Sequence, residues 1–220
     1  MADTGNEPVV VIGLGRFGTA LALELRRRRT QVLAIDSSPK IVQSLAGQLT
    51  QVVTADSTNI DALRQLGVPD FYRAVVAIGT DLEASILTTS LLVELGIDDI
   101  WAKAISREHG RILERIGAHH VVLPEHDMGE RIAHLVSGQM LDYIEVDKDF
   151  AIVKTKPMRE IVGIPLGETR LRAKHGVTVV SVKRQDENFT YATADTVLNY
   201  GDVILVAGQI DDIERFVESL

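Results

Sequence analysis

Three glycines near the start of the chain have the spacing of a phosphate-binding turn. The β-branched run Val9–Ile12 comes first, and Gly13, Gly15 and Gly18 follow it directly. Gly13 permits a tight turn, Gly15 lets the backbone approach a phosphate, and Gly18 lets the next helix pack on the strand. The helix N-terminus behind this turn favours an anion. With a strand before it, a helix after it and Asp36 beyond, the motif predicts nucleotide binding.

Two acidic residues follow the next two apolar runs. Asp36 can accept hydrogen bonds from both ribose hydroxyls, and its charge disfavours the 2′-phosphate of NADP. Its alternative role is the N-cap of the following helix. Asp56, after the third run, either caps a helix or contacts an adenine amino group, and the sequence leaves both roles open.

Three further charges fall where a nucleotide's phosphates would lie. Arg16, between the second and third glycines, adds positive charge to the helix end and suits a polyphosphate. Lys103 follows Trp101 near the end of the fifth expected strand, and Glu125 follows Pro124 after the sixth, at the edge where doubly wound sheets bind ligands. Lys103 would contact phosphate, and Glu125 would be a metal ligand or the partner of a cation. The alternative for both is a solvated loop charge.

Motifs for catalysis are missing from the sequence. There is no cysteine, no HExxH, no GxSxG and no GxxxxGK[ST], and the six histidines lack metal-site spacing. A dehydrogenase also needs a substrate domain with a proton donor, and the C-terminal segment of about 75 residues is short for one. The pattern favours a sensor over an enzyme.

Alternating strand-like and helical stretches must position these residues. The expected strands end at Ile12, Ile35, Thr54, Ile78, Ala104 and Leu123. Six strands with five intervening helices predict a Rossmann-like α/β fold, a doubly wound parallel sheet.

The pattern changes after Pro124. A long helix is expected over Asp127–Met140, followed by strand-like segments, a short helix near 167–174, two further strand segments and a final helix over Ile210–Leu220. This order predicts a separate small α+β domain. The strand segments are Tyr143–Val146, Ala151–Lys154, Val177–Val182 and Val203–Val206.

Composition narrows the class of protein. The chain has 220 residues and a formal net charge of −8, which disfavours an extended nucleic-acid surface. The only cluster of basic residues in the sequence is Arg26–Arg29, and the favoured explanation for this cluster is a solvated helix end. Apolar runs are strand-sized, and the first residues carry no signal region, so we expect a soluble cytoplasmic protein.

An ordered set of segments resembles the KtrA/TrkA family of cytosolic regulators of bacterial potassium transporters, which are built from RCK (regulator of potassium conductance) domains. The segments are VVVIGLGRFGTALALEL, VLAIDSSP, TADST, AVVAIG, IWAKA, ERIGAHHVVLPEHDMGERIA and RLRAKHG, and together they cover nearly the whole chain. The resemblance implies an RCK N domain over 1–126, a crossover helix over 127–141 and an RCK C domain over 142–220.

The resemblance also implies an assembly and a set of ligands. It implies a non-enzymatic, homo-octameric ring of dimers that docks on a membrane-embedded potassium-transporting subunit at the inner face of the cell membrane. ATP and ADP, and in some members NAD or NADH, would bind the N domain. The residues carried over are Gly13, Gly15, Arg16, Phe17, Asp36, Ser37, Ser38, Asp56, Ser57, Ile78, Gly79, Thr80, Lys103, Ala104, Ile105, His109 and Glu125.

Three finer expectations come from the same resemblance. Glu125 would place Mg²⁺ or another cation beside the ATP γ-phosphate, and Arg16 would reach the neighbouring subunit's nucleotide across the dimer. Arg172 matches an arginine that binds cyclic di-AMP in some C domains. The match weakens upstream, where Glu168 replaces an aspartate and Arg170 replaces an asparagine.

The leading hypothesis is therefore a nucleotide-sensing gating subunit of a potassium uptake system that switches on ATP versus ADP. The alternative is an NAD(H)-dependent oxidoreductase or NAD(H) redox sensor. A transcriptional regulator is disfavoured, because neither the acidic balance nor any helix-turn-helix pattern supports DNA contact.

Overall fold

The computed structural model describes residues 7–136 and 140–220. The chain forms two compact units, the first ending at Glu125 and the second running from His126 to Leu220. The N-terminal residues 1–6 and residues 137–139 of the predicted long helix lie outside the described residues.

Among the described residues, the first unit has a six-stranded parallel sheet in the order β3-β2-β1-β4-β5-β6. Its strands are β1 (Val9–Ile12), β2 (Val32–Asp36), β3 (Gln51–Thr54), β4 (Arg73–Val76), β5 (Asp99–Lys103) and β6 (His120–Val122). Its helices are α1 (Arg16–Arg27), α2 (Pro39–Leu45), α3 (Ile60–Gln65), η1 (Val68–Asp70), α4 (Leu82–Glu94) and α5 (Arg107–Ile116). The predicted doubly wound sheet is confirmed.

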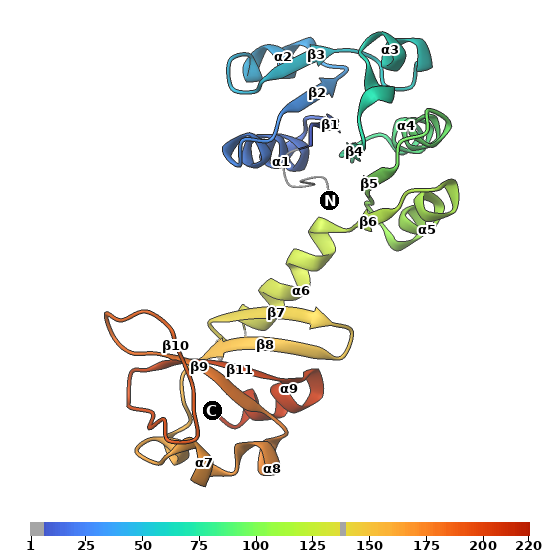
Figure 1. Ribbon diagram of the computed structural model, residues 1–220. Helices are drawn as coiled ribbons and strands as arrows, with labels where there is room; N and C mark the ends of the chain where they lie inside the picture. Colours follow the sequence, from blue (N-terminus) through green and yellow to red (C-terminus); the bar gives the residue numbers. More distant parts are fainter. Residues whose placement is uncertain (1–6, 137–139) are drawn as a thin grey trace. The chain divides into compact units, whose positions relative to one another are not determined.

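Both faces of this sheet are covered by helices, which explains why its central strands are apolar along their whole length. Residues of α1 and α2 pack on one face, and residues of α3, α4 and α5 pack on the other. In Figure 1, α1 and α4 lie on opposite sides of the strands. β1 is buried at every position, so it is the centre of the core.

Several strands end at other residues than the apolar runs suggest. β4 ends at Val76 instead of Ile78, β5 at Lys103 and β6 at Val122. The Ala77 amide still donates to the Ile12 carbonyl at 2.7 Å, but the chain then leaves the sheet. The apolar residues past each strand end therefore belong to loops at the carboxyl edge.

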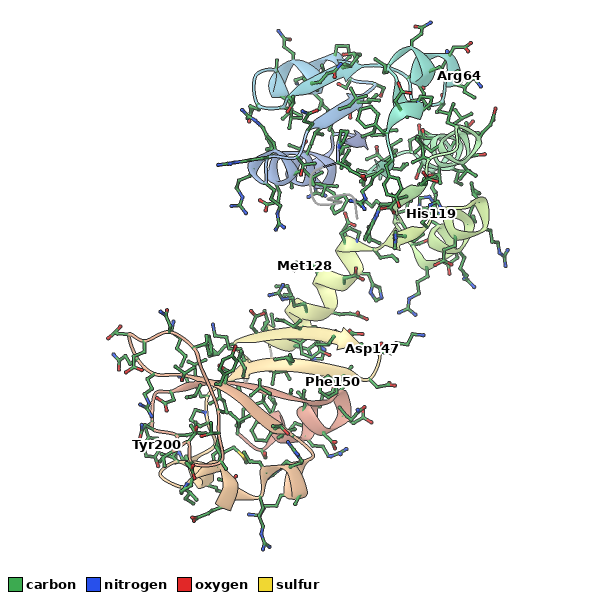
Figure 2. The ribbon with its side chains drawn as sticks, in the orientation of Figure 1. Arg64, His119, Met128, Asp147, Phe150 and Tyr200 are labelled. Atoms are coloured by element: carbon green, nitrogen blue, oxygen red, sulfur yellow. The ribbon has the colours of Figure 1, made fainter. Side chains whose placement is uncertain are left out.

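The second unit is built on an antiparallel sheet in the order β10-β9-β11-β8-β7, as the predicted α+β domain requires. Its strands are β7 (Asp142–Asp147), β8 (Phe150–Thr155), β9 (Thr178–Lys183), β10 (Thr190–Tyr191) and β11 (Val203–Gln209). Its other elements are η2 (Arg159–Ile161), α7 (Leu166–Thr169), α8 (Leu171–His175) and α9 (Ile210–Glu218). Asp147 and Phe150 flank the turn between β7 and β8 (Figure 2).

Three local predictions for this part of the chain differ from the structure. The helix expected at 167–174 is two short helices, because Arg170 between them has a left-handed φ of 55°. The helix expected from Asp127 begins earlier, as α6 (Pro124–Val136). β10 was not predicted, since a strand of two residues leaves no alternation to detect.

α6 carries the chain from the first unit into the second (Figure 1). Every helix in the described part of the chain is too short or too polar to span a bilayer.

Candidate nucleotide-binding site

A cleft of about 970 Å³ lies at the carboxyl edge of the parallel sheet. This is the edge at which open α/β sheets bind ligands, beside the point where the strand order reverses between β1 and β4. The lining comprises Ile12, Gly13, Gly15, Arg16, Phe17, Ile35, Asp36, Ser37, Ser38, Ile41, Ala55, Asp56, Ser57, Thr58, Ala77, Ile78, Gly79, Thr80, Asp81, Glu83, Ala84, Leu87, Lys103, Ile105 and Glu125.

The glycine turn has the geometry that its three glycines predict. Gly13 has a φ of 91°, a conformation that side chains rarely tolerate. A Cβ on Gly18 would overlap with the carbonyl oxygen of Gly13, so this glycine permits close packing of α1. A Cβ on Gly15 would meet nothing within 4 Å, and no side chain caps the start of α1 there. The first amides of α1 are therefore available to an anion in the cleft.

Asp36 connects the glycine turn to the end of β2 through a hydrogen bond. Its Oδ2 accepts a hydrogen bond from the Leu14 amide at 2.6 Å, and its Oδ1 accepts one from the Ser38 amide at 2.8 Å. The N-cap of α2 is Ser38, so the capping role considered for Asp36 is wrong. A carboxylate oxygen has more than one lone pair, so the same group can still accept from a ribose hydroxyl.

Asp56 also makes a local turn. Its Oδ1 accepts from the Thr58 hydroxyl at 2.7 Å and from the Thr58 amide at 2.9 Å, and these bonds lower the pKa of the carboxyl. The next helix is capped by Asn59, whose side chain accepts from the amides of Asp61 and Ala62. Of the two roles left open for Asp56, capping is therefore wrong, and adenine contact stays a prediction.

Lys103 and Glu125 form an ion pair at the cleft, with 2.6 Å between Nζ and Oε1. The Lys103 side chain is only 10% exposed, whereas that of Glu125 is 64% exposed. The hydrogen bond from Lys103 holds the pKa of Glu125 below its usual range, and the charge of Arg16 adds to the effect. A Cβ on Gly79 would come within 3.0 Å of the Lys103 nitrogen, so this glycine leaves room for the ammonium group.

The cleft brings together all of the predicted cofactor-binding residues except Ala104 and His109. His109 is buried, and its Nδ1 accepts from the Ile105 amide at 3.3 Å. Burial lowers the pKa of this imidazole, which favours the neutral ring. His109 therefore supports the loop after β5 from behind. Ser57 does line the cleft, but its hydroxyl bonds to that of Thr88 at 2.8 Å.

Sequence reasoning missed the contribution of α4. Asp81, Glu83, Ala84 and Leu87, around its first turns, line the cleft. Asp81 is the N-cap, accepting from the Ala84 amide at 3.0 Å. An aspartate just after the Ile78-Gly79-Thr80 loop is a helix-start signal that could have placed this helix at the site.

The side chains of the described residues do not by themselves complete a metal site at this cleft. Among the residues that the structure describes, no group of three or more His, Asp or Glu side chains could hold an ion. Glu125 offers one partly exposed carboxylate, which hydrogen-bonds to Lys103. Since Mg²⁺ is commonly bound by one or two carboxylates together with substrate phosphates, this donor set fits a cation only when a polyphosphate supplies further oxygens.

The second unit has a smaller cleft of about 460 Å³. Its lining includes the turn around Arg170, together with Arg172 and segments near Thr178 and Thr193. The Arg172 Nε donates to the Thr178 hydroxyl at 3.1 Å. The cleft therefore has two guanidinium groups beside apolar walls.

Two domain families match the chain. Residues 9–124 match the TrkA-N domain and residues 150–220 match the TrkA-C domain.

Curated relatives match over almost their whole length. The Ktr system potassium uptake protein C of Bacillus subtilis is 39% identical over 94% of both chains. The Ktr system potassium uptake protein A of the same organism is 36% identical over 98% of both chains. Its namesake in Vibrio alginolyticus is 34% identical over 99% of both chains.

Solved structures agree with the fold. The RCK domain of GsuK superposes with a TM-score of 0.65 over 99% of this chain, at 17% identity. A GsuK channel bound to NAD gives a TM-score of 0.63 over 96% of this chain, also at 17% identity. The chain spans about half, or less, of the length of these two structures.

Proposed function

This chain belongs to the TrkA/Ktr family and has a regulatory role in potassium transport, and from that premise we propose that it is a gating subunit that senses ATP versus ADP. The observation that carries the proposal is the meeting of Arg16, Lys103 and Glu125 at one cleft with the glycine turn. Arg16, Lys103 and the helix N-terminus favour a polyphosphate. The carboxylate of Glu125, paired with Lys103, makes this end of the cleft sensitive to the negative charge of the bound phosphates.

The cleft fits the other parts of an adenine nucleotide as well. Asp36 lies where a ribose would place its hydroxyls, because it ends β2 beside the glycine turn. Asp56 and the apolar side chain of Ile41 line the cleft along α2 and the loop after β3. An adenine ring placed between them would meet one carboxylate for its amino group and one apolar surface for its face.

Discrimination between ATP and ADP follows from the Lys103–Glu125 ion pair. A phosphate that takes the ammonium group of Lys103 as its partner leaves the Glu125 carboxylate without one. A divalent cation then satisfies both the carboxylate and the extra negative charge that ATP has relative to ADP. ATP and ADP thereby leave the end of β6 in different states, and only such a difference can shift a conformational equilibrium.

The proposal includes an assembly. The chain performs no chemistry in it and works as a cytoplasmic homo-octameric ring of dimers, bound at the membrane to a potassium-transporting subunit. Arg16 is exposed at the start of α1, which suits contact with a neighbouring subunit's nucleotide. The support for the membrane partner is the near full-length similarity to Ktr system potassium uptake proteins.

A competition series on the purified protein tests this proposal. A fluorescent adenine nucleotide is displaced by ATP, ADP, NAD, NADH and cyclic di-AMP, with and without magnesium. We expect ATP and ADP to bind, and magnesium to strengthen ATP alone. Glu125→Gln is expected to reduce the magnesium effect at least about tenfold, because loss of even an outer hydrogen-bond partner of a metal ligand typically costs that much affinity. Glu94→Gln, on the same unit but outside the cleft, is the matched control.

The rival function is NAD(H) sensing. It draws support from Asp36, which suits the unphosphorylated ribose of NAD as well as that of ATP. A strong preference for NADH in the same series, with ATP and ADP inactive, would replace the adenylate switch with a redox sensor.

We also propose a second ligand site for cyclic di-AMP in the second unit. Arg172 and Arg170 both line the smaller cleft, and paired guanidinium groups suit two phosphates. Direct calorimetric titration of cyclic di-AMP into the wild type and into Arg172→Gln tests this, because a ligand of the smaller cleft need not displace a nucleotide from the first unit. Binding that survives the substitution would refute the assignment.

A further inference from the structure

A second cluster of charged groups lies at the amino edge of the parallel sheet, away from the nucleotide cleft. Arg73 begins β4, Asp99 begins β5 and His120 begins β6. The strands are in register as Arg73 beside Asp99 and Trp101 beside His120. The three residues therefore come from three neighbouring strands, and the nucleotide site uses none of them. His119, labelled in Figure 2, directly precedes β6.

The Asp99 carboxylate is nearly buried and only half satisfied. Its Oδ2 accepts from the Arg73 Nε at 2.5 Å, while Oδ1 is buried with no hydrogen-bond partner among the described residues. The residue is 9% exposed. An unsatisfied oxygen of a buried carboxylate is destabilising, so this position favours any donor that can reach it.

His120 is the group placed to become that donor. Its Nε2 stands 3.5 Å from Asp99 Oδ1, just beyond hydrogen-bonding range. Its ring stacks on the indole of Trp101, with 4.1 Å between the centroids and 23° between the planes. The imidazole is half exposed, so a proton can reach it from solvent.

We propose that protonation of His120 strengthens the attachment of β6 to β5. On protonation the imidazolium donates to the orphaned oxygen of Asp99 and gains the attraction of a cation for the indole face. Without that proton, the Nε2–Oδ1 pair at 3.5 Å makes only a weaker contact.

The surroundings of His120 leave Asp99 as the charge that governs it. The Arg73 Nε donates a hydrogen bond to Asp99, the residue that lies between Arg73 and His120. The Nδ1 of His119 accepts a hydrogen bond from the Ile100 amide at 3.0 Å. On α1, which packs on the same face as Trp101, Glu24 pairs with Arg27 and Arg28. On α5, across the sheet, Glu114 and Arg115 form no ion pair with His120 in the part of the chain that the structure describes.

The position of His120 gives this contact a structural consequence. β6 has only three residues and forms the edge of the sheet, and it leads through Pro124 to Glu125 and α6. Lys103 and Glu125 hold the chain at one end of the strand, and His120 and Asp99 hold it at the other. Proton uptake thus tightens the segment that connects the two units. This inference does not depend on which nucleotide binds.

Trp101 provides a local reporter, because it is the single tryptophan of the chain and stacks on the proposed switch. Its fluorescence is measured on the intact protein between about pH 8 and about pH 5.5. A protonated imidazole quenches indole emission, so we expect the wild-type signal to fall on acidification. His120→Gln is expected to abolish this fall. His119→Gln is the matched control, since glutamine can still accept from the Ile100 amide, and it is expected to keep the fall.

Three results would overturn the proposal. They are a wild-type signal that does not change with pH, a change that persists in His120→Gln, and a change that His119→Gln also loses. The partner is tested without substitution by the carboxyl carbon signal of Asp99 in nuclear magnetic resonance. We expect this signal to move over the same pH interval as the fluorescence, and a signal that stays fixed would exclude Asp99 as the group that responds.

Discussion

Replacing Asp36 with alanine tests the site most sharply, because this carboxylate has two tasks that can be measured separately. It accepts from the Leu14 amide in the glycine turn and from the Ser38 amide before α2. Both bonds exist without a ligand, so the substitution is expected to affect the ligand-free protein as well as nucleotide binding.

The magnitude follows from these two bonds. Hydrogen bonds to a charged acceptor contribute about 1.5 kcal/mol or more each, so losing both lowers the free energy of unfolding by about 3 kcal/mol. For a unit of this size that corresponds to a fall of roughly 10 °C in Tm. Losing two ribose hydrogen bonds of the same strength weakens ADP binding by on the order of 100-fold.

The assay is differential scanning calorimetry of the ligand-free protein, combined with ADP titration of Asp36→Ala. Asp61→Ala is the control, since Asp61 is exposed in the first turn of α3 and pairs only loosely with Arg64 at 3.8 Å. Lost affinity with an unchanged Tm would refute the role of Asp36 in the turn. Unchanged affinity would refute the ribose assignment.

Three further predictions concern single residues of the first unit. Gly15→Ala is expected to unfold at the wild-type temperature, because the added methyl group would meet no atom within 4 Å. It is expected to bind ADP at least about tenfold more weakly, because the methyl group occupies the space above the turn that the phosphates need. A Tm scan and an ADP titration check these two results. Gly18→Ala, whose Cβ would overlap with the Gly13 carbonyl, is expected to lower Tm or prevent folding, as circular dichroism would show. Burial lowers the pKa of His109, so the unfolded chain binds a proton more readily and stability is lost as pH falls through the imidazole range. In urea titrations at about pH 7.5 and about pH 5.5, His109→Gln is expected to lose less stability than the wild type.

Much of the fold could be predicted because its signals are local. The continuous apolar runs identify buried parallel strands. Because open α/β sheets bind ligands at the carboxyl ends of their strands, residues at those ends are expected to line the cleft. Lys103 and Glu125 were found in this way, and Arg16 was found from its place between the second and third glycines. All three line the cleft.

What the sequence could not predict depends on contacts between distant segments. The hydrogen bond from the Leu14 amide to Asp36 depends on the pairing of β1 with β2 in this register, which the pattern of residues does not reveal. His109 is not among the residues that line the cleft, because it is buried on α5. The left-handed Arg170 divides a helix that periodicity alone makes continuous, since an arginine gives no local signal for a positive φ.

The pairing of Asp99 with His120 also escaped sequence reasoning. Asp99 and His120 are separated by a whole helix, and they come together only because β5 and β6 are neighbours in register. His119 directly precedes β6 and His120 begins it, and the two histidines have different partners.

Hydrogen exchange of the intact protein, measured without ligand, with ADP, and with ATP plus Mg²⁺, tests the central claim most directly. We predict that both nucleotides protect the glycine turn and the start of α2, and that ATP with Mg²⁺ alone changes exchange from β6 to the start of α6, where Glu125 lies. Identical exchange patterns for ADP and for ATP with Mg²⁺ would contradict the account, because the protein would then have no means of telling the two nucleotides apart.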